Sequence, residues 1–211
     1  MKVLQILPQL NIGGVERGTL DLSKALIHKG HQSFVISGGG VLVDELTQCG
    51  AKHYEIPVHI KSLRTLSLAK RLSETISSID PDIVHVRSRM PAWVNYRAFK
   101  MLQKKPLLVS TFHGLYSFPI YSKVMSFVDH SIAISKTVER YILENYKLDK
   151  GDITVIPRGC DPLEFNNEVI NPVDKANIIE EFPQIVGKKV LTIPGRITKW
   201  KGVAEFIDLL S

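Results

Sequence analysis

The stretch LQILPQLNIGGVERGTLDLSKALIHKG, residues 4–30, decides the fold. An apolar run ends at Pro8, and Gly13 and Gly14 then precede apolar residues at helical spacing, which Gly30 closes. A fully apolar run is typical of a strand buried on both faces of a parallel sheet. Glycine directly after a periodic segment is a helix stop signal. The stretch therefore predicts a strand, a glycine-containing turn and a helix.

The same alternation of strand and helix continues along the chain. Further strands are predicted over HQSFVIS, KHYEIPV, DIVHV, PLLVSTF, SIAIS and ITVIP. Helices are predicted over VDELTQCG, which Gly50 ends, over a segment from Ala69 to Ile79 that Asp80 and Pro81 end, over residues 92–103, and after an N-cap at Ser135. This regular order predicts a doubly wound, mostly parallel α/β sheet of the Rossmann-like kind.

The pattern weakens near Asn166, where asparagines and prolines flank one weak helical segment, as expected of a linker. KKVLTIPGRITKWKG then starts a second cycle of strand, glycine, basic loop and helix. One strand and one helix fall well below the roughly 50 residues of a minimal domain. The sequence predicts a Rossmann-like domain over residues 1–165, a linker over 166–187 and the first βα unit of a truncated second domain over 188–211.

Composition narrows the functional classes. The 211 residues are 44% hydrophobic and 23% charged, as in ordinary globular proteins. No apolar stretch reaches the roughly 18 residues of a membrane-spanning helix, and the N-terminus lacks the pattern of a signal peptide, so a cytoplasmic location is expected. Cys49 and Cys160 lie far apart with no CxxC pair, so neither a disulfide framework nor a metal site is expected. The net charge of +6 favours anionic partners, but without an RNP motif or a Cys/His finger nucleic acid is not expected among them.

The glycines after the first strand suit an anion site. In open α/β sheets, ligands bind beyond the carboxyl ends of strands, where glycines admit a phosphate to the N–H groups of a helix N-terminus. The spacing Gly13, Gly14, Gly18 is not GxGxxG, and no acidic residue ends the second strand, which argues against a dinucleotide-dependent oxidoreductase. On spacing alone, a phosphate site and a tight turn without ligand remain equal alternatives.

Two further segments follow predicted strand ends. His113 and Gly114 come directly after PLLVSTF, on the same predicted edge as the glycine loop, and an imidazole there can donate to a phosphate or sugar hydroxyl. Arg196 and Lys201 follow the restart strand, where two cations suit a diphosphate. The alternatives are a structural histidine and a solvated basic loop.

Taken together, GGVERGTLDLSKAL, STFHG, VIPRGCD and PGRITKWKG resemble the retaining, group-1 glycosyltransferases of the GT-B fold, in the same order and over essentially the whole chain. The resemblance is closest to a bacterial branch of envelope-saccharide, lipopolysaccharide-type transferases, which carry similar RSRMPAW and PRG stretches. It implies transfer of a sugar, with retention, from a nucleotide-sugar to an envelope saccharide or lipid-linked acceptor. The nucleotide-sugar is then a co-substrate, and no cofactor or metal is implied.

The resemblance also implies roles for single residues. The N-terminal domain would hold the acceptor and the C-terminal domain the nucleotide-sugar. Gly14 would offer its amide to the distal phosphate of the donor, and His113 would lie at the reacting centre. Arg196 and Lys201 would neutralise the charge of the leaving nucleoside diphosphate, which is transition-state electrostatics without a metal.

The other implied site residues surround these four. Gly13, Gly114, Glu16 and Arg17 belong to the donor-phosphate side of the cleft. Glu16 complements the helix dipole, and Arg17 meets the acceptor or an interdomain carboxylate. The acceptor-side candidates are Arg87, Arg89, Arg158 and Asp161.

Two departures from the family pattern leave alternatives open. Arg158 stands where the broader family often has asparagine, which fits either an anionic acceptor or a local ion pair. The pair of glutamates that binds donor sugar and ribose in the family has no counterpart before Ser211. The chain is therefore either part of a longer transferase, or a non-catalytic remnant or acceptor- or membrane-binding half that needs a separate C-terminal polypeptide.

The segment LYSFPIYSKVMSFV after His113 combines aromatic and apolar residues with Lys123. Aromatics beside cations suit a surface that docks on anionic lipid, which predicts peripheral association with the inner face of the cytoplasmic membrane. The alternative is that the aromatics pack the domain's own core. The apolar residues concerned are Tyr116, Phe118, Ile120, Tyr121 and Phe127, and the basic ones shortly before them are Arg87, Arg89, Arg97, Lys100, Lys104 and Lys105.

Overall fold

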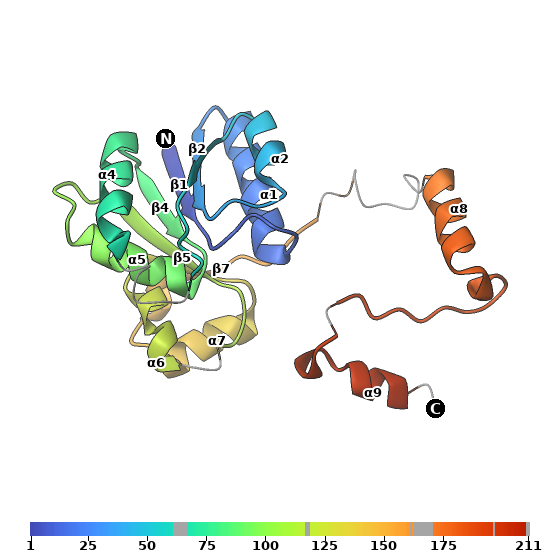
Figure 1. Cartoon of the computed structure of the whole chain (residues 1–211). Coiled ribbons are helices and arrows are strands. Elements are labelled where there is room, and N and C mark those ends of the chain that lie inside the picture. The colour runs from blue at the N-terminus through green and yellow to red at the C-terminus, as the bar shows by residue number, and fades with distance from the viewer. Residues whose placement is uncertain (61–66, 117–118, 161, 163–170, 196, 210–211) are drawn as a thin grey trace. The chain divides into compact units, whose positions relative to one another are not determined.

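The computed structural model of the chain describes residues 1–60, 67–116, 119–160, 162, 171–195 and 197–209 (Figure 1). By its internal contacts the chain divides into two units, Met1–Arg158 and Gly159–Ser211. Within the described residues, no helix is both long enough and apolar enough to cross a lipid bilayer.

The described part of the first unit is built on one sheet of seven parallel strands, in the order β3-β2-β1-β4-β5-β6-β7. The strands form at the seven runs where the sequence predicts them, which confirms the Rossmann-like α/β fold. They are β1 (Lys2–Ile6), β2 (Gln32–Ser37), β3 (Lys52–Glu55), β4 (Ile83–Val86), β5 (Leu107–Phe112), β6 (His130–Ala133) and β7 (Ile153–Val155).

Helices cover the sheet on both faces, because successive strand side chains point to opposite faces. Leu4 and Ile6 of β1 join the larger core, whereas Gln5 between them bonds to α1. Figure 1 shows α1 and α2 on the opposite side of the sheet from α4 and α5. The helices of this unit are α1 (Gly14–His28), α2 (Val43–Gln48), α4 (Ala69–Ile79), α5 (Arg89–Phe99), α6 (Pro119–Ser122) and α7 (Lys136–Asn145), with short 3-10 turns η1 (Lys123–Ser126) and η2 (Lys150–Asp152).

Local signals set most helix ends. Ser135 caps α7 as predicted, since its side chain accepts a hydrogen bond of 3.2 Å from the Val138 N–H. The helix predicted over residues 92–103 instead spans Arg89–Phe99. Pro91 is compatible with this earlier start, because N–H groups in the first turn of a helix have no intrahelical partner to lose.

The strand order creates a switch point between β1 and β4. From β1 the chain proceeds through α1 to β2 on one side, and from β4 it proceeds through α5 to β5 on the other. At such a point the connections diverge and leave a crevice beyond the carboxyl ends of the strands. The loops after β1 and β4 therefore flank the place where open α/β sheets bind ligands.

The second unit differs from its prediction. Its described helices are α8 (Pro172–Glu181) and α9 (Val203–Asp208), with 3-10 turns η4 (Pro183–Ile185) and η5 (Lys199–Lys201). The strand expected at the start of 188–211 is wrong, since residues 188–194 form neither helix nor strand. A strand needs a neighbour to satisfy its N–H and C=O groups, and the described residues of this unit contain no strand that could serve.

Candidate functional site

Four predicted site residues follow strand ends at the carboxyl-terminal edge of the sheet. Gly14, which begins α1, comes after β1, and Arg87 comes directly after β4. His113 directly follows β5, and Arg158 lies shortly beyond β7. Because all strands are parallel, these positions share one edge, as the sequence predicts for Gly14 and His113.

Arg87 is buried at the switch point, with only 3% of its surface exposed. Its Nη1 donates to the side-chain oxygen of Gln5 at 2.7 Å and to the Gly18 carbonyl at 3.3 Å. Its Nε is buried and has no hydrogen-bond partner among the described residues. Burial, and then the positive charge of Arg158, lower the pKa of Arg87 to about 10, while nearby acidic side chains act in the opposite direction.

Arg158 lies against the start of α1. Its Nη2 donates to the Gly14 carbonyl, across 144 positions of sequence. A Cβ at position 18 would meet the Arg158 guanidinium, so the glycine there permits this close approach. The residue that replaces the asparagine common in the family is thus a contact between the end of the first unit and the glycine loop.

His113 lies beside these two cations. Burial, and then the charges of Arg87 and Arg158, lower its pKa to about 3, so the imidazole is neutral at pH 7. Its Nε2 is buried and has no partner within the described part of the chain. The adjacent His85 on β4 is also neutral, and its Nε2 is bonded to the Thr111 hydroxyl at 2.7 Å. The Nε2 atom of His85 is therefore hydrogen-bonded, whereas the Nε2 atom of His113 is free to bind a ligand.

The N-terminus of α1 is open in front of this group. Gly13 precedes the helix in extended conformation, and no side chain caps the helix. The N–H groups of a first helical turn have no intrahelical acceptors, so they are available to an anion. Gly14 is exposed, and nothing lies within 4 Å of the place where its Cβ would be. The Glu16 carboxylate lies over Gly13, where it complements the helix dipole as predicted.

Arg17 and Arg89 make contacts within the first unit. Arg17 forms an ion pair of 3.0 Å with Glu45 of α2. Arg89 stacks on Tyr116 and Tyr121, with its guanidinium carbon 4.9 Å and 5.4 Å from the ring centres. Such stacking orients a guanidinium, and the Arg89 Nη1 also donates to the Ser122 hydroxyl at 3.5 Å.

The remaining predicted residues are Arg196, Asp161, Lys201 and Gly114. Arg196 and Asp161 lie outside the described residues. Lys201 ends η5 in the second unit. Gly114 follows His113 and has nothing within 4 Å of the place where a Cβ would be, so the loop is open there.

Two residues of this site were missed at the sequence level. Gln5 is fully buried in β1, where it accepts from Arg87 and donates to the Thr19 carbonyl and the Ser23 hydroxyl. Its signal is a single amide in an otherwise apolar strand, since buried polar groups need partners. Gly18 enters the prediction through the helical pattern and the glycine spacing but not as a site residue, although a glycine inside a helix costs about 1 kcal/mol relative to alanine and so calls for a reason.

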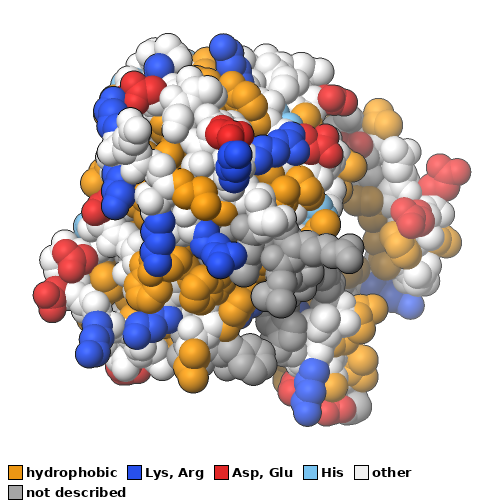
Figure 2. Space-filling model, turned by 60° about the vertical axis from the view of Figure 1, so that its left-hand side comes forward, with side chains coloured by type: hydrophobic (Ala, Val, Ile, Leu, Met, Phe, Trp, Pro, Cys, Tyr) orange, Lys and Arg blue, Asp and Glu red, His pale blue; other side chains and the backbone are white. Residues whose placement is uncertain are grey.

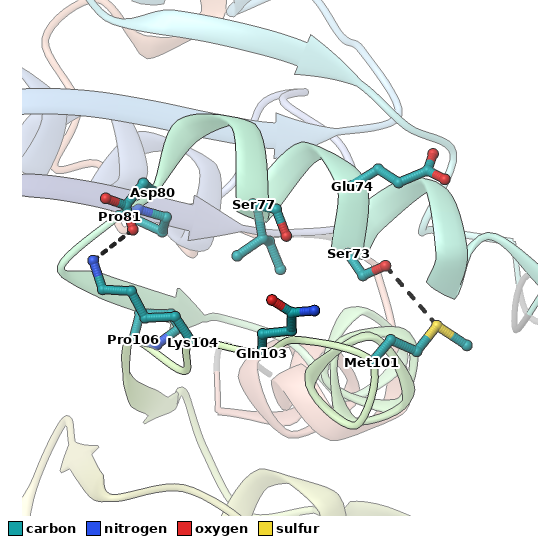
Figure 3. A pocket seen from close by; sticks show the side chains of 10 residues that line it. Ser73, Glu74, Ser77, Asp80, Pro81, Met101, Gln103, Lys104 and Pro106 are labelled. Carbon is teal, nitrogen blue, oxygen red and sulfur yellow. Dashed lines mark hydrogen bonds and ion pairs between the residues drawn. The ribbon is translucent and has the colours of Figure 1, made fainter.

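A pocket of about 540 Å³ lies elsewhere, between α4 and the segment of residues 101–106 that follows α5 (Figure 3). Pro81 and Pro106, which border it, lie just before β4 and β5, so it opens at the amino-terminal edge of the sheet. The Lys104 Nζ and an Asp80 carboxylate oxygen, 2.8 Å apart, form an ion pair at its border. The cluster of perturbed side chains at the opposite edge is the better functional candidate, since perturbed pKa values concentrate at functional sites.

Comparisons with known proteins agree with this arrangement. A glycosyltransferase structure from Rickettsia africae is 35% identical, with a TM-score of 0.81 over 99% of this chain and 56% of its own. The structure of Anabaena HepE in complex with UDP and glucose has a TM-score of 0.78 at 18% identity, over 100% of this chain and 57% of its own. An uncharacterised glycosyltransferase of Methanocaldococcus jannaschii is 32% identical over 155 residues, which are 65% of this chain and 38% of the relative.

The chain thus spans 56–57% of these two solved structures, and 38% of the archaeal protein. The resemblance to GT-B glycosyltransferases of the group-1 type is confirmed. The match to the family described as Glycosyltransferase Family 4 extends over residues 12–163, which include the glycine loop, both arginines and His113. This chain belongs to glycosyltransferase family 4.

Proposed function

We propose that this chain is the acceptor-side part of a retaining glycosyltransferase that moves a sugar from a nucleotide-sugar to an envelope saccharide or lipid-linked acceptor. The observation that carries the proposal is His113, a neutral imidazole with an unpaired Nε2, between two arginines and the open N-terminus of α1. A group of this kind at the switch point of an α/β sheet suits a sugar that carries a phosphate.

The donor is a nucleotide-sugar in this proposal. The amides at Gly13 and Gly14 bind its distal phosphate, and the helix dipole of α1 favours that charge. His113 lies next to the transferred sugar and uses its free nitrogen for a hydroxyl or phosphate oxygen. Arg196 and Lys201 neutralise the leaving diphosphate, so no metal or cofactor is needed. The complex of Anabaena HepE with UDP and glucose supports this choice of donor class.

The acceptor enters from the side of the arginines. Arg87 and Arg158 are held against α1, and Arg89 is oriented by two tyrosine rings. Asp161 completes the candidates on this side. Since the chain spans just over half of its solved relatives, the full reaction is part of the proposal.

Saturation-transfer NMR on the 211-residue chain tests the function, with UDP-glucose, UDP-N-acetylglucosamine, GDP-mannose and NAD as probes. We expect at least one nucleotide-sugar to receive saturation at its sugar protons. His113→Ala is expected to weaken that signal several-fold. His28→Ala on the exposed end of α1 is the matched control and leaves it unchanged. Saturation of NAD with no nucleotide-sugar bound would instead favour a dinucleotide enzyme.

We also propose peripheral association with anionic membranes, through the segment after His113. Ile120 is 89% exposed and Leu115 is 59% exposed, close in sequence to the exposed Lys123. Figure 2 shows basic side chains among apolar ones on the face it presents. The structure reduces the predicted set, because Arg87 is buried and Phe118 lies outside the described residues.

The aromatic rings of this segment are partly committed to packing. Tyr116 packs on Phe112 with ring centres 5.5 Å apart, and Phe127 packs on Tyr96 at 5.3 Å. Tyr121 packs on Trp93 at 6.4 Å. The lipid contact proposed here therefore rests on the exposed aliphatic and basic side chains rather than on the rings.

A further inference from the structure

Arg87 is a charged side chain in an unusual position. It is 97% buried, yet the two acceptors that bind its Nη1 are neutral, namely the Gln5 amide oxygen and the Gly18 carbonyl. Among the described residues, no carboxylate forms an ion pair with it. Burial of an ion without a counter-charge costs several kcal/mol unless a partner of opposite charge is supplied.

The neighbours of Arg87 increase this imbalance. Arg158 adds a second positive charge that lowers the pKa of Arg87, and it too lacks a carboxylate partner within the described residues. Glu16 and Asp21 act on Arg87 only through space. The neutral network of Gln5, Thr19 and Ser23 holds Arg87 in place without compensating its charge.

Two unpaired polar atoms belong to side chains that interact electrostatically. They are Arg87 Nε, a donor, and His113 Nε2, which donates or accepts according to the tautomer. Because buried polar atoms of native proteins are nearly always bonded, the pair indicates a bound group with oxygen acceptors. A planar or tetrahedral oxyanion satisfies guanidinium donors particularly well.

We propose that Arg87 and Arg158, beside His113, bind an anionic substituent, a phosphate or a carboxylate, carried by the acceptor saccharide. The inference rests on the proposed transferase function and names the chemical class of its acceptor. All three side chains belong to the first unit, on the acceptor side, whereas Lys201, proposed for the donor diphosphate, belongs to the second.

The histidine provides a readout that does not depend on turnover. Arg87 and Arg158 lower the pKa of His113, and neutral His85 and Tyr116 lie beside it. An anion bound between the arginines offsets their charges. The bound anion therefore raises the pKa of His113. NMR measures this pKa from the imidazole CH resonances of His113 as the pH is lowered.

The experiment titrates the 211-residue chain with glucose 6-phosphate and glucuronate as anionic probes, and with glucose, inorganic phosphate and UDP as comparisons. We expect one anionic sugar to bind at least tenfold more tightly than glucose or inorganic phosphate and to raise the pKa of His113 by a unit or more. Arg158→Gln and Arg87→Lys are each expected to weaken that binding about tenfold. Arg140→Gln, exposed on α7, is the matched control without effect.

Each other outcome overturns the inference. If UDP alone shifts the His113 resonance and both arginine variants weaken the binding of UDP, the cluster binds the donor diphosphate. The proposed function then stands, but the acceptor class inferred here is wrong. If inorganic phosphate binds as tightly as the anionic sugars, the site binds an anion without recognising a saccharide. If the arginine variants bind the anionic sugar as tightly as the parent chain does, the arginines do not bind its anionic group. If neither anionic sugars nor nucleotide-sugars bind, the proposed function fails as well. Arg87→Lys keeps the charge, and circular dichroism of each variant verifies that it folds.

Discussion

At the scale of single residues, the neutral state of His113 links folding to pH. Its pKa is about 3 in the folded chain, against the ordinary value of 6.5 when unfolded. Below pH 6.5 the unfolded chain therefore takes up a proton that the folded chain does not, and stability falls as pH drops from about 6.5 towards 3. His85 acts in the same direction, because burial also lowers its pKa.

We expect the free energy of unfolding to fall between pH 7 and 4.5, by up to about 1.4 kcal/mol per pH unit for each such histidine. Urea denaturation at several pH values measures this slope. His113→Asn is expected to reduce the slope by up to one proton, and His28→Asn, exposed on α1, leaves it unchanged. Equal slopes for His113→Asn and the parent chain would contradict a neutral, buried His113.

Gly18 allows stability and binding to be separated. Gly18→Ala is expected to stabilise α1 by roughly 0.5–1 kcal/mol, as alanine usually does inside a helix. The new Cβ displaces the Arg158 guanidinium, which is the end of a flexible, exposed side chain and can move. The melting temperature should thus stay equal or rise, while affinity for the anionic sugar falls as in Arg158→Gln. Loss of stability without loss of binding would show that Arg158 does not use this position.

At the scale of elements, the second unit is expected to be weakly protected. Leu191 is 64% exposed and Leu209 is 77% exposed, and neither α8 nor α9 has a buried residue. Amides of residues 188–209 should exchange with solvent far faster than those of β1 (Lys2–Ile6), because few packed contacts oppose local opening. Hydrogen exchange read by mass spectrometry measures both in one sample. Comparable protection in the two segments would sink this expectation.

The elements also show where sequence reasoning succeeds. Most strands of the first unit are short runs rich in apolar residues, and the neighbouring runs supply partners in register, such as Val3 with Ser33 and with Ile83. Residues 188–194 have a similar local pattern but form no strand, because pairing depends on a neighbour that local sequence does not encode. Gly14 and His113 could be placed at one edge from strand ends alone. The contact of Arg158 with Gly14 could not, since only the folded sheet unites positions so distant in sequence.

At the scale of the whole molecule, the chain spans 56–57% of the length of two solved relatives. The glutamate pair that the family uses for donor sugar and ribose has no counterpart in this sequence. The 211-residue chain is therefore expected to bind nucleotide-sugar weakly and to give little or no transfer. Incubation with a bound donor and candidate acceptors, followed by product detection by mass spectrometry, measures this. Robust turnover by the purified chain would be the contrary result.

Membrane association is the second property of the whole molecule. Co-sedimentation with vesicles of phosphatidylcholine alone, and of phosphatidylcholine with phosphatidylglycerol, should show binding only to the anionic vesicles, weakened by salt. Ile120→Glu is expected to reduce binding several-fold. Val41→Glu, an exposed apolar position before α2, is the matched control. Equal binding to both vesicle types, or to neither, would remove the proposal.

Arg158 is the last residue of the first unit and is tied to the first residue of α1. An acceptor that draws this guanidinium towards its own anionic group must loosen the tie to the Gly14 carbonyl. Binding of the acceptor would then change the position of the backbone at Arg158, where the first unit ends, without a separate regulatory site.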